Sequence, residues 1–260
     1  MISVADNLRI TIPAIARAVE NKDPAPVQKL VAQCRDAGAH AIDINSGPLS
    51  RYPKDKMRFL VETVRAVTDL PLVLDTSNPD AMAAGLAYSG GTVIINGISL
   101  EPEKLSRILP LALSHDCDVI GYLLDADGHV PADTESRMEA AVALFGECQA
   151  AGLSPDRLIV DPVVAPLSWP DGNHQNIAIL DVVRTLPDLL GFPVRTIAGL
   201  SNLTTGAPDN SYRRIHQQAF LPMLAAAGAS MILMNALDPG LMTMARACEK
   251  IRNQSIFSWE

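Results

Sequence analysis

Short apolar runs alternate with longer stretches of helical spacing along nearly the whole chain. The short runs are rich in Val, Ile and Leu, which is typical of strands buried on both faces, as in residues 70–75 and 157–161. The longer stretches place apolar side chains three and four positions apart, as residues 55–68 do at positions 57, 60, 61, 64 and 67. The pattern therefore predicts a regular alternation of strands and helices.

Eight strand–helix pairs follow from this reading, and their rhythm fits a single (β/α)8 TIM barrel. No composition break divides the chain, so we expect residues 1–260 to form one domain. An open doubly wound sheet would also alternate, but no Gly-x-Gly-x-x-Gly motif follows the first strand. Strands are expected at residues 2–8, 40–45, 70–75, 92–96, 118–124, 157–161, 194–199 and 231–234. Helices are expected at residues 12–21, 25–37, 55–68, 101–114, 134–151, 173–189, 211–227 and 238–252, with one more starting at Pro79.

Composition narrows the class of protein. With 48% hydrophobic and 19% charged residues, the chain can bury a large core, and its net charge of −8 argues against a nucleic-acid-binding face. The four cysteines lack zinc-ligand spacing, which favours buried thiols in a reducing cytoplasm. The N-terminus does not resemble a signal peptide, and Pro222, Gly228 and Asn235 interrupt the one uncharged run of membrane-spanning length. We expect a cytoplasmic protein without a membrane segment.

Polar side chains occupy the predicted C-terminal ends of most strands, which meet at the active-site mouth of a (β/α)8 barrel. A single Asp in such a place is usually a turn former or a helix cap. Several carboxylates at one mouth are different, because they repel one another unless a ligand or shifted pKa values relieve them. Gly199 also stands at a strand end, where a residue without a Cβ lets a ligand approach the backbone. The polar group comprises Asp43, Asn45, Asp75, Asn96, Asp161, Ser201, Asn202, Asn235 and Asp238.

The chemistry of these strand ends favours a particular ligand. They supply carboxylates and carboxamides, with no histidine, no lysine and no cation for a phosphate. Such a set suits a flat heterocycle that carries amide and amino hydrogens, such as a pterin or a purine. A second interpretation is that Asp43, Asp75 and Asp161 hold magnesium or calcium, which prefer oxygen ligands. The histidines are scattered, and we interpret them as surface or structural residues.

Seven short segments at compatible spacing carry a family resemblance. They lie at residues 23–28, 43–48, 74–78, 84–86, 95–96, 161–162 and 199–202, and they include the sequences DINSGP at 43–48 and GLSN at 199–202. Together they resemble the methyltetrahydrofolate:corrinoid protein methyltransferases, whose fold is similar to that of dihydropteroate synthase.

The resemblance implies a substrate and roles for named residues. A pterin would be held by Asp75, Asn96 and Asp161, with Asp43 nearby, and Asn202 would be the catalytic residue that hydrogen-bonds the pterin N5. The methyl group would pass between tetrahydrofolate and the cobalt of a corrinoid (cobalamin) on a partner protein, in a direction that the sequence does not set. No resident metal is implied, and the family resemblance suggests a homodimer.

Three segments depart from the family pattern. The first strand ends in Asp6-Asn-Leu-Arg9 in place of a Glu-Arg-Ile-Asn-like sequence. The usual Asp-Ser-Thr is Asp75-Thr76-Ser77, with the last two residues exchanged. Residues 203–218 diverge, and Arg213 or Arg214 would substitute for an arginine expected there. Two alternatives stay open. A dihydropteroate synthase would need basic groups for diphosphate, whereas its Ser-Arg-Lys loop is Ser201-Asn202-Leu203 here. A folate-binding subunit without catalysis is the other.

Overall fold

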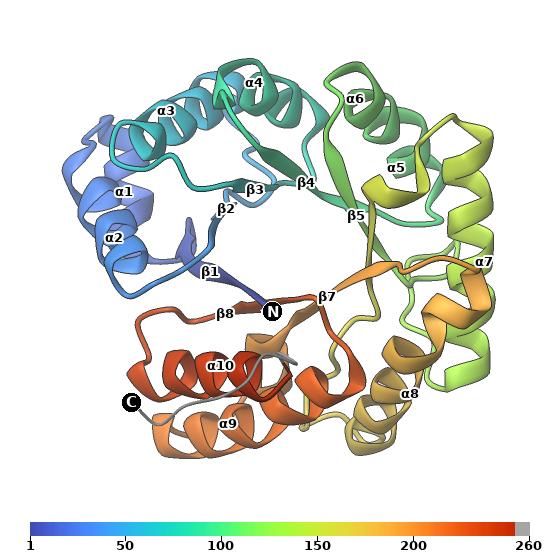
Figure 1. The fold of residues 1–260 in the computed structure, drawn as a ribbon. Coiled ribbons are helices and arrows are strands. Elements are labelled where there is room, and N and C mark those ends of the chain that lie inside the picture. The colour runs from blue at the N-terminus through green and yellow to red at the C-terminus, as the bar shows by residue number, and fades with distance from the viewer. Residues whose placement is uncertain (253–260) are drawn as a thin grey trace.

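A computed structural model describes residues 1–252, in which eight parallel strands close into a barrel in chain order. The strands form a ring and the helices surround it (Figure 1). The expected (β/α)8 fold is therefore confirmed. The strands are β1 (Ile2–Arg9), β2 (Ala41–Asn45), β3 (Leu72–Asp75), β4 (Val93–Ile98), β5 (Asp118–Tyr122), β6 (Leu158–Asp161), β7 (Arg195–Gly199) and β8 (Met231–Met234). Residues 253–260, which the expected single domain includes, lie outside the described part.

The helices follow the strands as the spacing predicts, with one correction. Residues 101–114 form two short helices, because Pro110 lacks an N–H and its ring excludes the carbonyl one turn earlier, so the chain breaks at Ile108. The helices are α1 (Pro13–Asn21), α2 (Ala25–Asp36), α3 (Pro53–Arg65), α4 (Pro79–Ser89), α5 (Pro102–Arg107), α6 (Leu109–Ser114), α7 (Thr134–Ala150), α8 (Gly172–Leu190), α9 (Asn210–Ala227) and α10 (Pro239–Arg252). Two 3-10 turns, η1 (Pro155–Arg157) and η2 (Leu200–Thr204), complete the described elements.

The uncharged run at residues 217–237 is confirmed as a helix, a turn and a strand. Helix α9 ends at Ala227, and Gly228 takes the left-handed conformation that lets the chain turn into β8. Among the described residues, no helix has both the length and the apolar character needed to cross a membrane. The four cysteines are buried free thiols, as expected.

The barrel interior begins with an apolar layer. Side chains alternate between the two faces of a strand, so residues two apart on each strand point to the same side. The inward side chains near the strand starts pack into one buried cluster: Val4, Ala41, Val73, Ile94, Ile120, Ile159, Ile197 and Met231. The same alternation brings the residue two positions further along each strand inward, directly above this layer.

Arg137 fixes the segment that follows β6. This arginine of α7 is fully buried. It donates hydrogen bonds to the carbonyl oxygens of Pro162 and Val163 (3.3 Å to Val163) and to Oε1 of Gln175 on α8 (3.0 Å). The guanidinium therefore ties α7 to the first residues after Asp161 and to the helix beyond them.

We predict that Arg137→Met lowers the free energy of unfolding by about 2–4 kcal/mol, because it leaves buried carbonyl groups without a donor. Urea unfolding measures this change. The matched control is Arg184→Met on the exposed side of α8, where the arginine pairs with Asp181 at 2.8 Å near solvent. Its expected effect is within about 0.5 kcal/mol, and equal effects of the two substitutions would contradict the role of Arg137.

Candidate active site

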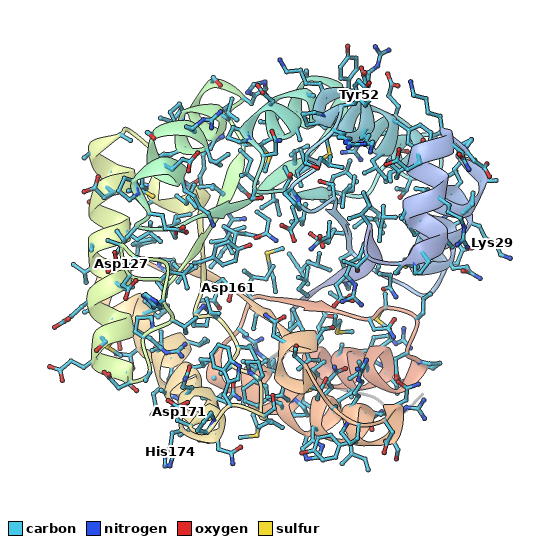
Figure 2. The ribbon with its side chains drawn as sticks, turned by 180° about the vertical axis from the view of Figure 1, so that it is seen from behind. Lys29, Tyr52, Asp127, Asp161, Asp171 and His174 are labelled. Atoms are coloured by element: carbon cyan, nitrogen blue, oxygen red, sulfur yellow. The ribbon has the colours of Figure 1, made fainter. Side chains whose placement is uncertain are left out.

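A layer of polar side chains lies directly above the apolar interior. Two residues beyond the apolar layer, six strands place a side chain that carries oxygen: Asp6, Asp43, Asp75, Asn96, Tyr122 and Asp161. Strand pairing sets Asn45 beside Asp75, Asp75 beside Asn96, and Tyr122 beside Asp161. Asp161 lies near the barrel centre, whereas Lys29 and His174 lie at the periphery (Figure 2). The structure thus brings the expected Asp43, Asn45, Asp75, Asn96 and Asp161 to one mouth.

Asp43 lies deepest in this layer. It is 1% exposed, and neither carboxylate oxygen has a hydrogen-bond partner among the described residues. Burial, followed by the nearby charges of Asp75 and Asp6, raises its pKa well above the ordinary range of an aspartate, and Arg9 opposes this shift. Burial therefore favours the neutral acid form of Asp43 at the floor of the mouth.

Asp75 and its neighbours form a connected set. The amide of Asn45 donates to Oδ2 of Asp75 at 2.5 Å, and the Tyr122 hydroxyl donates to Oδ1 of Asn96. Burial raises the pKa of Asp75 to about 6, and the positive charge of Lys104 opposes the rise. Burial and the charges of Asp75, Asp161 and Asp43 also raise the pKa of Tyr122, so its phenol stays a hydrogen-bond donor.

Asp161 occupies the opposite part of the ring. Its Oδ1 accepts a hydrogen bond from the backbone N–H of Val163 at 2.8 Å. This bond fixes the same turn whose carbonyl groups Arg137 binds. Burial raises the pKa of Asp161 to about 7, while the Val163 hydrogen bond and the Arg137 charge act in the other direction. Asp75 and Asp161 are thus two carboxyl groups that titrate near neutral pH in one mouth.

The expected residues after β7 lie on the 3-10 turn η2. The hydroxyl of Ser201 donates to Oδ2 of the buried Asp6, which joins this turn to β1. Asn202 is exposed, and its carboxamide lies against Gly199, where an added Cβ would come within 3.0 Å of Nδ2. Gly199 therefore makes room for the Asn202 side chain at the edge of the mouth. The backbone N–H of Leu167 donates to the Leu203 carbonyl at 2.9 Å, so the loop after β6 supports the same turn.

Four residues of the mouth escaped prediction. Asp6 and Tyr122 each lie two residues after an inward-facing apolar residue, as the expected carboxylates do. The alternation of side chains along a strand could therefore have predicted that they face inward. The expectation that the mouth lacks a cation is wrong. Arg9 ends β1 and influences the pKa of both Asp6 and Asp43, and Lys104 of α5 reaches within 5.5 Å of the Tyr122 ring centre.

The remaining strand-end candidates have local structural roles. Asn235 accepts a hydrogen bond from Nδ2 of Asn7 at 2.6 Å, and Asp238 accepts from the backbone N–H groups of Gly240 and Leu241 at the start of α10. The metal interpretation of Asp43, Asp75 and Asp161 gains no support. Within residues 1–252, three potential metal-ligating side chains lie close enough together, with ligand atoms within 4.8 Å of one another, at Asp125, Asp127 and His129. These three residues are exposed, and none of them belongs to the polar layer.

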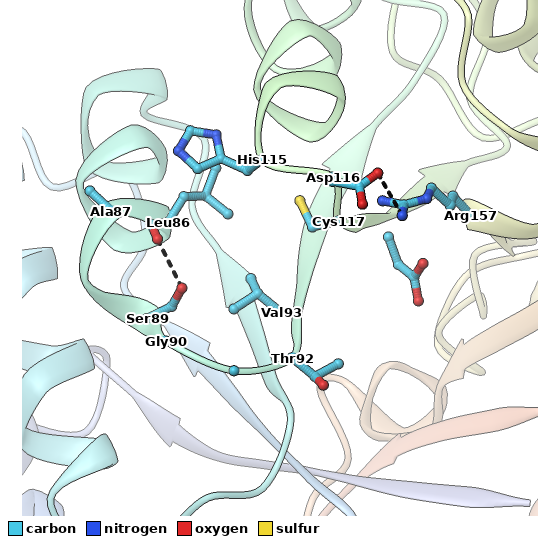
Figure 3. Close-up of a pocket in the computed structure, with 12 residues that line it drawn as sticks. Leu86, Ala87, Ser89, Gly90, Thr92, Val93, His115, Asp116, Cys117 and Arg157 are labelled. Carbon is cyan, nitrogen blue, oxygen red and sulfur yellow. Dashed lines mark hydrogen bonds and ion pairs between the residues drawn. The ribbon is translucent and has the colours of Figure 1, made fainter.

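A hollow lies at the opposite end of the barrel from the polar layer (Figure 3). It is lined by Val93 and Asp118, the first residues of β4 and β5, and by the Asp116–Arg157 ion pair at 2.6 Å. The strand starts of such barrels contribute stability, whereas chemistry takes place at the strand ends. We therefore assign the site to the polar layer at the opposite mouth.

Comparison with known proteins identifies the family of the chain. Residues 14–235 match the sequence family described as pterin binding enzyme, which is most of the chain. The chain belongs to the pterin-binding enzyme family. The expected family resemblance is thereby confirmed. The matched segment includes every polar residue of the layer except Asp6, and it also includes Asn202.

Two curated relatives of the chain are named for methyl-transfer or methionine-forming activities. It is 25% identical over 246 residues to the methylcorrinoid:tetrahydrofolate methyltransferase of Eubacterium limosum, a match that covers 93% of this chain and 88% of that protein. It is 24% identical over 236 residues to the methionine synthase of Mycobacterium tuberculosis. That match covers 86% of this chain but 19% of the methionine synthase.

Solved structures of dihydropteroate synthases share the fold. The enzyme from Xanthomonas albilineans in complex with 7,8-dihydropteroate aligns with a TM-score of 0.67 and 21% identity, over 96% of this chain and 92% of that one. The enzyme from Stenotrophomonas maltophilia aligns with a TM-score of 0.68 and 19% identity, over 88% and 89% of the two chains. The expected similarity in fold to dihydropteroate synthase is confirmed.

We predict that Asp43→Asn stabilises the protein at pH 8 by about 1–3 kcal/mol, because it replaces a buried acid that resists ionisation. The pKa of Asp43 is raised on folding, so the cost of burying it grows as the pH rises above the pKa of the unfolded chain. The gain should therefore be smaller at pH 5 than at pH 8. Thermal unfolding at both values measures it. Asp188→Asn on the exposed surface is the control, and a gain independent of pH would refute the assignment.

Proposed function

We propose that the protein is a folate-binding methyltransferase that moves a methyl group between N5 of tetrahydrofolate and the cobalt of a corrinoid. The observation that carries this proposal is the polar layer of carboxylates and carboxamides beside Asn202, in a chain of the pterin-binding family. The relative from Eubacterium limosum, named for methyl transfer between a methylcorrinoid and tetrahydrofolate, supports the reaction class.

The layer is suited to a pterin ring. Ionised Asp75 and Asp161 accept hydrogen bonds from ring N–H and amino groups, and Asn45 and Asn96 supply both donors and acceptors. Both aspartates have raised pKa values in the free protein, because burial disfavours their charge. Donors from a bound pterin would favour the ionised forms and so lower these pKa values. Binding is then coupled to proton release.

Asn202 is the proposed catalytic residue. When cobalt(I) attacks the methyl carbon, a Co–C bond forms as the C–N5 bond breaks. The electron pair of the C–N5 bond stays on N5, which takes up a proton from solvent, and the cobalt product is methyl-cobalt(III). Electron density builds up on N5 as the C–N5 bond breaks. A carboxamide N–H directed at N5 therefore stabilises the transition state more than the ground state. Asn202 suits this role because its carboxamide lies at the exposed edge of the mouth, where a second reactant can approach.

The second reactant is too large to enter the layer. We propose that a corrinoid protein presents its cobalt at the open mouth, and that the reaction runs in whichever direction the methyl donor dictates. Both the corrinoid partner and the homodimeric state stay predictions.

Dihydropteroate synthase activity is a second candidate, which three arginines near the mouth favour. Arg9, Arg213 and Arg214 line a hollow beside the polar layer, and such groups suit a diphosphate. The turn after β7 nevertheless lacks a lysine or arginine at Ser201-Asn202-Leu203. Formation of dihydropteroate from a dihydropterin diphosphate and p-aminobenzoate would establish this candidate.

We predict that the dissociation constant of methyltetrahydrofolate increases by about tenfold from pH 8 to pH 6, because Asp161 must be ionised to accept pterin hydrogens and its pKa is about 7. Calorimetric titration across this range measures it. Asp161→Asn should bind more weakly and lose most of the pH dependence. A constant affinity in the wild type would remove Asp161 from the pterin site.

We predict that Asn202→Ala slows methyl transfer by about 10²–10³-fold and weakens methyltetrahydrofolate binding much less, since the donor acts mainly on the transition state. Single-turnover rates with cob(I)alamin and calorimetric dissociation constants separate the two effects. Gln149→Ala, which removes an exposed carboxamide near the end of α7, is the control and should change neither. Equal losses of rate and affinity would show that Asn202 only binds.

A further inference from the structure

Three arginines from two parts of the sequence meet in a hollow of about 500 Å³ at the edge of the mouth. Arg9 comes from the end of β1, and Arg213 and Arg214 from the first turns of α9. The lining also contains Ser201 and the hydroxyl side chains of Thr204 and Thr205. The two segments that depart most from the family pattern, the end of the first strand and residues 203–218, therefore build one feature together.

The hollow carries positive charge on an acidic protein. Asp238 is the one acidic residue of its lining, and it already pairs with Arg214, Nε to Oδ2, at 3.4 Å. Within residues 1–252, neither Arg9 nor Arg213 makes an ion pair with a carboxylate. A chain with a net charge of −8 thus keeps a local site for an anion.

The position of the hollow connects it to the polar layer. Ser201 lines the hollow and donates to Asp6 of the layer, and the next residue is Asn202. Arg9 also faces both, because it lines the hollow and its charge lowers the pKa of Asp6 and Asp43. A ligand whose ring occupies the layer can therefore extend past Asn202 into the arginines.

We propose that this hollow binds the carboxylates of the glutamyl tail of the folate, and that the protein prefers folates that carry several γ-linked glutamates. This inference rests on the proposed function, because it needs the pterin ring in the polar layer. Each added glutamate brings one more carboxylate, and guanidinium groups bind carboxylates with two parallel hydrogen bonds. Arg213 and Arg9 are the proposed contacts, since Arg214 is already paired with Asp238.

The test compares three probes by calorimetry at low and high ionic strength: 6-methyltetrahydropterin, which has no tail, monoglutamyl methyltetrahydrofolate and its triglutamyl form. We expect the triglutamyl form to bind about tenfold more tightly than the monoglutamyl form at low ionic strength, and less so in high salt. Arg213→Gln should reduce this ratio to about threefold, and Arg9→Gln with Arg213→Gln should bring it close to one.

The matched control is Arg184→Gln, which removes the same charge from an exposed position on α8 and should keep the wild-type ratio. Arg213 lies on an exposed helix surface, so its variant tests the proposal even if Arg9→Gln disturbs the layer. Equal affinity of the wild type for all three probes, or an unchanged ratio in Arg213→Gln and the double variant, would overturn the tail site while leaving the pterin site intact.

Other outcomes have distinct meanings. Absence of binding by the tailless pterin as well as by both folates would overturn the tail site together with the proposed function. A double variant that keeps the affinity ratio but transfers methyl groups only to free cob(I)alamin, and no longer to a corrinoid protein, would assign the arginines to partner docking. Synthesis of dihydropteroate from a dihydropterin diphosphate would assign them to diphosphate. Either result would overturn the tail site.

Discussion

The alternation of side chains along the barrel strands is the constraint on which the site depends. It stacks a layer of carboxylates and carboxamides directly on an apolar layer, so the acids are buried or half-buried and their charge is poorly solvated. Burial raises the pKa values of Asp43, Asp75 and Asp161, and mutual repulsion adds to the effect at Asp43. The mouth is consequently a set of acids whose ionised forms a ligand with hydrogen-bond donors would favour.

The site combines residues held rigidly on strands with one residue on an exposed turn. The layer residues lie on strands, where packing fixes each side chain, and Arg137 fixes the turn after Asp161 from outside the barrel. Asn202 instead lies on a 3-10 turn at the edge, held through the neighbouring Ser201–Asp6 hydrogen bond. This division would suit the proposed reaction, in which the pterin ring is held deep in the layer and its methyl group faces a large second reactant.

The sequence predicted the barrel because most strands are short apolar runs and the stretches between them keep helical spacing, apart from the break at Ile108. It also predicted Asp43, Asp75, Asn96 and Asp161, since each is a polar residue at the end of such a run. Tyr122 was missed because it lies inside an apolar run, where only the register shows that it faces inward. Arg9 was missed because the expected strand stopped at Leu8.

The positions of Lys104 and Arg213 depend on the conformation of the loops that precede their helices. Lys104 reaches Tyr122 because Pro102 starts a short helix soon after β4, in a segment where one continuous helix was expected. Arg213 meets Arg9 because residues 200–204 form a 3-10 turn before α9 begins. Neither path can be derived from periodicity, because loop geometry sets where a helix starts but leaves no repeating pattern in the sequence.

Methyl transfer between methyltetrahydrofolate and free cob(I)alamin, followed under anaerobic conditions as the loss of cobalt(I) absorbance, tests the central claim most directly. The protein should accelerate this loss well above the uncatalysed rate, or accelerate the reverse reaction from methylcobalamin and tetrahydrofolate. If a corrinoid protein is required, adding one should restore turnover in the same assay. Tight binding of methyltetrahydrofolate without transfer in either direction, with free or protein-bound corrinoid, would contradict the assignment and identify a folate-binding subunit.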